Sequence, residues 1–272
     1  MKLLYIVADQ SVVPSVADFV SQVARKMEAS LLVLVAAEKE QTLAEAEASF
    51  ANVCQTFDGL PYTAKFVLGD PVSSMNAELE KESYQMILMG VRRRQRLIPS
   101  HFRLVSQRII KHSPIPIMLV RDIRGKLERM LVCTGGLDIS EPVVDLSAKL
   151  ATKTGMEATL LTVSAAVPSM YTGMMEMEET LEELLETETP LAQHLRHSAE
   201  ILAKSGIPAQ IKVRHGDVVE AILAETAEGQ YDVLVLGETQ SQTLRGLLLG
   251  SVTQQIINRA PSAVLISKST FD

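Results

Sequence analysis

The stretch YDVLVLG, residues 231–237, is a short aliphatic run that starts at a tyrosine and stops at a glycine. The stretch YQMILMG, residues 84–90, has the same form 147 residues earlier. Unbroken aliphatic runs of this length are typical of strands buried on both faces of a parallel sheet. The pair therefore predicts the same strand in two copies of one α/β domain.

The correspondence between the two copies continues on both sides of these strands. Downstream, VSQRIIKHSPIPIML at 105–119 matches VTQQIINRAPSAVLI at 252–266 without a gap. Upstream, the residues after Pro14 match those after Pro142, at a separation of about 129 rather than 147. The second copy is therefore longer in its middle, and a repeat of this size predicts two domains in tandem.

The chain length agrees with this division, because 272 residues exceed the about 100–200 of a typical domain. We predict domains at 1–123 and 127–272, with the charged segment RDIRGKLE at 121–128 as the linker. Aliphatic runs alternate with amphipathic stretches in both, and Thr189 and Pro190 are start signals for one helix. The predicted fold class is α/β: two tandem Rossmann-like three-layer sandwiches, each around a five-stranded, mainly parallel sheet.

Composition and charge exclude several classes of function. The net charge of −7 and the pI near 5.4 repel nucleic acid and anionic membrane surfaces. The apolar run near the N-terminus stops at Asp9, too early for a signal peptide or a membrane span. We therefore expect a cytoplasmic protein that binds neither nucleic acid nor membrane, with Cys54 and Cys133 as buried, reduced thiols.

The segment after YDVLVLG has the order strand, polar loop and helix. Ligands of doubly wound sheets bind at the carboxyl ends of the strands, where a helix N-terminus offers free N–H groups to phosphate. This order predicts a site between Gly237 and Thr253. A second interpretation stays open, in which Gly250 supplies a turn and Ser251 with Gln254 forms a capping box without a ligand.

At this loop the chain resembles the universal stress protein family, whose domains carry a G-x2-G-x9-G-[S/T] nucleotide motif. Gly237 matches the first glycine, Gly250 and Ser251 match the final pair, and Gln240 takes the place of the second glycine. The resemblance covers nearly the whole chain as two domains. It implies the adenine nucleotide alpha hydrolase-like form of the fold, and ATP, with magnesium, as the cofactor.

The resemblance also implies which residues contact the nucleotide. Adenine and ribose contacts fall at the ends of the first two strands of the second copy, and phosphate contacts fall along the motif. Members that bind ATP usually have an aspartate where this chain has Gly135. The residues implied are Thr134, Gly135, Val163, Gly237, Gln240, Gly250, Ser251, Val252 and Thr253.

The first copy departs further from the motif. Gly90 is retained, but Arg93 takes the place of the second glycine, and Arg103 with Leu104 takes the place of the final pair. We expect this copy not to bind nucleotide in the family's manner. The arginines of the segment 92–103 either receive an acidic partner or anion or form a solvated basic loop.

The insertion at 167–190 of the second copy is rich in methionine and glutamate. Its leucines predict a short amphipathic helix, which either forms a partner-binding edge or covers the domain. His194 and His197 stand three residues apart, but no third ligand is evident, so we predict no metal site. We find no nucleophile paired with a base, and therefore expect at most slow ATP hydrolysis and name no catalytic residue.

Two functions stay open. In the first, the chain is a stress-response or regulatory module that binds ATP or a related adenine nucleotide in the second domain only. In the second, it is a nucleotide-free interaction module that uses the arginine segment 92–103 and the insertion 167–190. The resemblance further implies that the two domains pair through their last strands, IPIML and SAVLI, like a family dimer. Further homodimerisation is left open.

Overall fold

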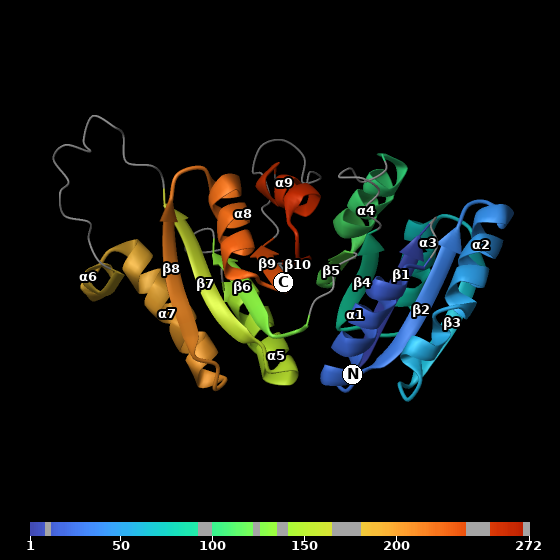
Figure 1. The fold of residues 1–272 in the computed structure, drawn as a ribbon, viewed down its shortest axis with the longest axis horizontal. Helices are drawn as coiled ribbons and strands as arrows, with labels where there is room; N and C mark the ends of the chain where they lie inside the picture. The colour runs from blue at the N-terminus through green and yellow to red at the C-terminus, as the bar shows by residue number, and fades with distance from the viewer. Residues whose placement is uncertain are drawn as a thin grey trace.

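The computed structural model describes residues 1–8, 12–91, 100–121, 126–134, 141–164, 181–237 and 251–268. The described strands form one ten-stranded sheet in the order β3-β2-β1-β4-β5-β10-β9-β6-β7-β8. Helices cover both faces of this sheet (Figure 1). The predicted α/β class with a mainly parallel sheet is confirmed.

The first half of the chain supplies one side of the sheet. Its strands are β1 (Lys2–Ala8), β2 (Ser30–Ala37), β3 (Tyr62–Leu68), β4 (Met86–Val91) and β5 (Ile117–Arg121). Its helices are α1 (Pro14–Lys26), α2 (Glu40–Ala51), α3 (Pro71–Leu79) and α4 (Ser100–His112), with a short 3-10 helix at Cys54–Phe57.

The second half repeats this order with one additional helix. Its strands are β6 (Arg129–Thr134), β7 (Glu157–Ser164), β8 (Ala209–His215), β9 (Val233–Gly237) and β10 (Ala263–Ser267). Its helices are α5 (Glu141–Thr154), α6 (Leu181–Glu186), α7 (Pro190–Lys204), α8 (Val218–Gly229) and α9 (Ser251–Arg259). The additional helix α6 belongs to the insertion. Helix α7 starts at the predicted residues, where the Thr189 hydroxyl accepts a hydrogen bond from the Ala192 N–H.

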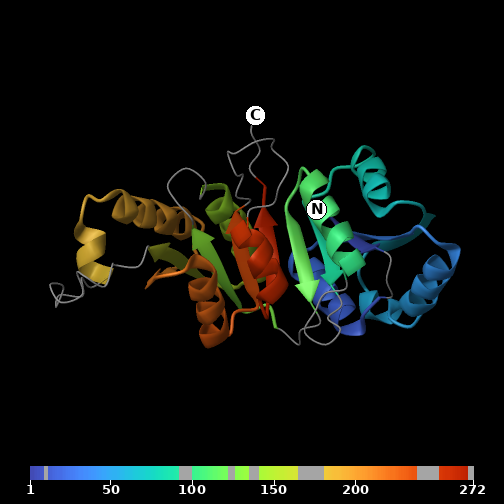
Figure 2. The same cartoon turned by 90° about the horizontal axis from the view of Figure 1, so that it is seen from above.

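The two halves meet through β5 and β10, which pair antiparallel, with Leu265 opposite Met118. Every other pairing in the sheet is parallel. Figure 2 shows β5 in green and β10 in red side by side at the centre. The structure therefore contains the expected pairing of the last strands, within one chain.

Two lysines add polar contacts between the halves. The Lys26 ammonium at the end of α1 donates to the carbonyl oxygens of Thr154, at 2.7 Å, and Leu127, at 3.1 Å. The Lys268 ammonium, just after β10, donates to the carbonyl of Ile110 near the end of α4. Cations are favourable at helix C-termini, where carbonyl groups have no partner within the helix.

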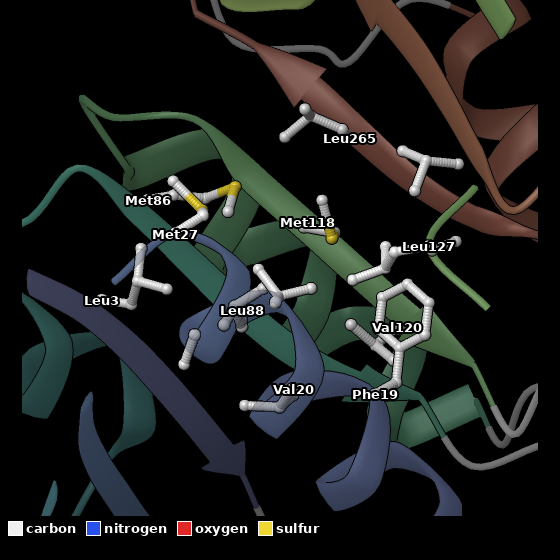
Figure 3. Close-up of a cluster of buried hydrophobic side chains, with 14 of the residues drawn as sticks. Leu3, Phe19, Val20, Met27, Met86, Leu88, Met118, Val120, Leu127 and Leu265 are labelled. Carbon is white, nitrogen blue, oxygen red and sulfur yellow. The ribbon is translucent and has the colours of Figure 1, made fainter. Parts of the chain in front are cut away.

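The hydrophobic core on the α1 and α5 side of the sheet runs across this junction. Leu88 and Met118 of the first half and Leu265 of the second belong to one buried cluster. Figure 3 shows Leu127, from the connection between the halves, beside Met118 and Val120. A continuous core and a continuous sheet make the two halves one packed body. The boundaries at 1–123 and 127–272 stay a prediction.

Candidate functional site

The carboxyl edge of the second half is where the predicted site residues gather. Strands β6 and β9 are neighbours, paired from Met130 with Val233 onward, and they end at Thr134 and Gly237. The chain leaves β6 toward α5 and leaves β9 toward α9, so the order of connections reverses between these two strands. Such a switch point is the usual place for a ligand in a doubly wound sheet.

Six of the nine predicted residues lie in the described part of the chain. Thr134, Val163 and Gly237 stand at the ends of three adjacent strands, and Ser251 is the first residue of α9. Gly135, Gln240 and Gly250 lie outside the described residues, as does the side chain of Ser251, so the capping-box interpretation stays a prediction. The six described residues therefore lie at one edge of the sheet, at the ends of its strands and at the start of α9.

The described side chains of Val163, Val252 and Thr253 turn into the protein. Val163 packs against the core on the α8 and α9 side, and Thr253 is buried in α9 while Val252 is half-buried. The first turn of an α-helix has backbone N–H groups without a partner in the helix. Contacts from these positions to a ligand would therefore come from the backbone.

Thr134 has a partner that the sequence did not reveal. Its hydroxyl donates to the carbonyl of Leu161 at 3.3 Å and lies 2.6 Å from the hydroxyl of Thr162, directly across on β7. Both threonines are buried. Thr162 could not be picked out from sequence, because its role depends on which residue of β7 faces Thr134.

Strand pairing also refines the match between the copies. Leu3 pairs with Met86 as Met130 pairs with Val233, so the first strands of the two copies are separated by 127 residues. Carried along the sequence, this separation makes Gly136 the second-copy equivalent of Asp9, and Gly135 the equivalent of Ala8. Both are glycines, so neither supplies the carboxylate that the resemblance leads one to look for.

In the first copy, the retained glycine has a packing role. A Cβ atom added to Gly90 would stand 2.8 Å from Cγ1 of Val16 on α1 and 3.3 Å from the hydroxyl of Tyr5. Tyr5 is fully buried, and burial raises the pKa of its phenol. The first motif glycine is thus required by packing in one copy, and does not by itself indicate a phosphate.

The remaining first-copy positions are only partly described. Residues 92–99 and the side chain of Arg103 lie outside the described residues, so the proposed basic surface is not placed. Leu104, which takes the place of Ser251, is 57% exposed on α4. Arg108, one turn further along α4, forms an ion pair with Asp70 at 2.8 Å.

A polar cluster that sequence reasoning missed recurs in both copies. Glu78 accepts from Lys65 at 2.8 Å and from the Tyr84 hydroxyl at 3.1 Å. Glu225 accepts from Lys212 at 2.7 Å and from the Tyr231 hydroxyl at 3.0 Å, and it also binds Arg214. The signal was available, because all three residue types recur at the separation of 147.

These clusters lie under the two outermost strands, β3 and β8. Burial alone would raise the pKa of Glu225, but hydrogen bonds from Lys212, Arg214 and Tyr231 outweigh it and hold the pKa below its usual value. An inward-pointing charge on an edge strand also discourages pairing with another chain. We assign the clusters to the fold rather than to a ligand.

His194 and His197 differ in their exposure to solvent. His194 is buried on α7, His197 is exposed, and the described residues contain no group of three or more potential ligands. The Nε2 atom of His194 is buried without a hydrogen-bond partner. Burial, and then the nearby His197, lower the pKa of His194.

The two cysteines differ in burial. Cys133 is a buried free thiol, as expected, whereas Cys54 is half-buried.

The insertion is described from Leu181 onward. Helix α6 confirms the predicted short helix, and its three leucines are half-buried. Arg196 on α7 holds its end by donating to the carbonyls of Leu185, at 2.6 Å, and Thr187, at 2.7 Å. Figure 1 shows α6 beside α7 at the outer end of the sheet.

None of the helices in the described ranges has the length and apolar character needed to span a bilayer.

Comparison with known proteins places this architecture. Universal stress protein Rv1636 of Mycobacterium tuberculosis (strain ATCC 25618 / H37Rv) is 30% identical over 143 residues, which are 52% of this chain and 96% of that protein. Universal stress protein YxiE of Bacillus subtilis (strain 168) is 25% identical over 143 residues, 51% of this chain and 97% of the relative. Each relative therefore corresponds in length to one half of the chain.

Among solved structures, a universal stress protein from Archaeoglobus fulgidus DSM 4304 superposes with a TM-score of 0.66 at 18% identity. The match covers 97% of this chain and 98% of the other, so both halves are included, and at this identity it supports the fold alone. The model of the universal stress protein family matches twice, at residues 11–121 and 126–268. The chain therefore belongs to the universal stress protein family, with two family domains in tandem.

Proposed function

We propose that the second half of the chain binds ATP or a related adenine nucleotide, and that the first half serves as its structural partner. The observation that carries this proposal is the convergence of Thr134 and Gly237 at the switch point of the sheet, followed by α9. A nucleotide there would have strand ends for its base and sugar and the first turn of α9 for its phosphates.

The residues present fit such a ligand through their backbone. Gly237 has no side chain to obstruct the approach, and the buried side chains of Thr134 and Thr253 leave their backbone groups as the contacts at this edge. Magnesium has less support, since the described residues contain no cluster of acidic or histidine ligands. We therefore propose that any magnesium is held mainly by the nucleotide's phosphates.

The first half differs where the phosphates would lie. Arginine and leucine at 103–104 replace the glycine and serine at 250–251. A long side chain at residue 103 would compete with the phosphate for space, and a leucine side chain offers no hydrogen bond. The proposal is therefore one nucleotide for each chain. It is also a proposal of binding and regulation in the cytoplasm, with hydrolysis at most slow.

Isothermal titration with ATP, with and without magnesium, tests this proposal. We expect one nucleotide for each chain and no binding by Gly250→Arg, which introduces the first-half residue. Leu104→Ser, the reciprocal change at the next motif position of the first half, is the matched control and should leave affinity unchanged. Two equivalent sites, or unchanged affinity in folded Gly250→Arg, would overturn it.

The alternative, a nucleotide-free interaction module, is favoured by one observation. Leu104 exposes 57% of its surface at the start of α4, directly after the arginine segment 92–103 in the sequence. An exposed leucine beside basic residues suits an acidic partner with an apolar anchor, and the insertion 167–190 would supply a second contact. Absence of ATP binding at millimolar concentration would favour this alternative.

A further inference from the structure

Three buried hydroxyl side chains stand at the carboxyl ends of neighbouring strands in the second half. They are Thr162 on β7, Thr134 on β6 and Ser267 on β10. Their exposed fractions are only 7%, 3% and 3%. Ser267 pairs with Gly237, and Thr134 pairs with Thr162. The pairing of Val132 with Val235, carried on by two residues, aligns Thr134 with Gly237, so the three residues and the glycine form one row across four strands. We call this the hydroxyl row.

The first half has valines throughout the same row. Val7 pairs with Val35 as Thr134 pairs with Thr162, and Val120 pairs with Gly90 as Ser267 pairs with Gly237. All three valines are buried in the core on the α1 side. Valine and threonine have nearly the same shape but differ in polarity. The fold therefore accepts an entirely apolar row at this level of the sheet.

Each hydroxyl in the second half makes a contact that valine cannot make. The hydroxyl of Thr134 donates to the Leu161 carbonyl and lies 2.6 Å from that of Thr162, which ties the end of β6 to β7. The hydroxyl of Ser267 donates to the carbonyl of Pro142 at 3.2 Å, which ties the end of β10 to the first turn of α5.

Burying a hydroxyl costs free energy that its hydrogen bond only roughly offsets. Stability alone therefore gives no reason to prefer the hydroxyl row to the valine row. Hydrogen bonds differ from apolar contacts in being directional, so they fix one orientation of the groups that they join. The row thus defines how β6, β7, β10 and α5 are placed around Gly237, the last residue of β9.

We infer that Thr134, Thr162 and Ser267 are positioning residues, which hold the ends of β6 and β7 and the first turn of α5 in the arrangement that the nucleotide site needs. This inference rests on the proposed function. It concerns side chains that do not touch the ligand. It identifies a difference between the halves that is independent of the glycine motif.

The test is to give the second half the valines of the first. The triple variant Thr134→Val, Thr162→Val, Ser267→Val is expected to fold, because the first half tolerates this row. Amide exchange of the end of β6 and of the second turn of α5, whose N–H groups bond to the carbonyls of the first turn, should become about fivefold faster, the factor equivalent to one net hydrogen bond. ATP affinity should fall by a similar factor while the midpoint of thermal unfolding stays unchanged.

Two further variants separate positioning from general packing. Thr134→Ser with Thr162→Ser retains both hydroxyls and should keep near-original exchange and affinity. Thr226→Val removes a buried hydroxyl that bonds to the Ile222 carbonyl within α8, away from the row, and should change neither. If the triple variant does not fold, Ser267→Ala alone should still speed exchange in the second turn of α5.

The exchange measurement tests, without nucleotide, whether the row orders this edge of the sheet. Unchanged exchange at both the end of β6 and the second turn of α5 in the valine variant would overturn the inference. An original protein that binds no ATP would instead refute the proposed function, and would leave the exchange result to be judged by itself. Faster exchange with unchanged ATP affinity would also overturn the inference, since the row would then order the edge without serving the site.

Discussion

Val16 on α1 lies so close to Gly90 on β4 that a Cβ atom at residue 90 would stand 2.8 Å from its Cγ1 methyl group. We expect Gly90→Ala to destabilise the protein by about 1–3 kcal/mol through overpacking. Chemical denaturation measures this change. Val16→Ala combined with Gly90→Ala should recover part of the loss, and purely additive effects of the two changes would contradict the packing explanation.

Glu225 should make stability depend on pH in the acid range. Its pKa in the folded protein is lowered, so its contribution is present above the unfolded value of 4.5 and is lost as the pH falls through the folded value. Glu225→Gln should lower stability at pH 7 by about 2–4 kcal/mol, because it breaks a buried ion pair. Unfolding free energy measured between pH 7 and pH 3 should fall less steeply in this variant.

The neighbouring Glu228 is the matched control for Glu225. It also binds Arg214, but its side chain is 63% exposed. Exposed ion pairs contribute about 0–1 kcal/mol, so Glu228→Gln should have a small effect. Equal losses from the two glutamine variants would show that the buried cluster does not stabilise the edge strand.

His194 should make the protein sensitive to mild acid. Its folded pKa lies below the unfolded value of 6.5, so stability is complete above that value and decreases as the pH falls toward the folded pKa. His194→Leu removes the unpartnered Nε2 atom and should flatten the pH dependence between 7 and 5. The exposed His197 serves as the control, and His197→Gln should retain most of the dependence, because burial, the larger cause of the lowered pKa, remains. A slope unaffected by His194→Leu would contradict this assignment.

Gln240 takes the place of the second motif glycine, and two opposing effects follow. Its side chain should keep the loop backbone from the phosphates, whereas its amide could donate a hydrogen bond to a phosphate oxygen. We expect steric exclusion to dominate, so Gln240→Gly should bind ATP more tightly, by about tenfold, or about 1.4 kcal/mol. Titration of the variant measures this, and weaker binding would make the amide a phosphate ligand.

The sequence was sufficient for the fold because the repeat gave each strand twice. The match of YQMILMG with YDVLVLG predicted the equivalent strands β4 and β9, and IPIML with SAVLI gave the strands that join the halves. The Lys65 and Glu78 cluster could have been found in the same way. Its members recur at the same separation, and they join the edge strand β3, through Lys65, to helix α3, through Glu78.

The candidate site was less accessible, because its key contacts join residues distant in sequence. That Thr134 faces Thr162 depends on the register of β6 against β7. For the residues after Pro14, sequence similarity predicts a separation of about 129 between the copies, whereas strand pairing places β2 and β7 127 residues apart. Gly90 illustrates the opposite limit. It matches the first motif glycine in a copy that we expect not to bind nucleotide, and its surroundings give a packing reason that no pattern in one sequence contains.

The two halves that meet at β5 and β10 are parts of one chain, so twofold symmetry does not constrain their sequences. In a homodimer with twofold symmetry, each substitution occurs twice, once in each equivalent position. Here, Ser267 and Val120 occupy equivalent rows and are encoded separately. One half can therefore be altered toward packing while the other keeps polar groups for a ligand. Because both halves belong to one chain, their association also does not weaken when the protein is dilute.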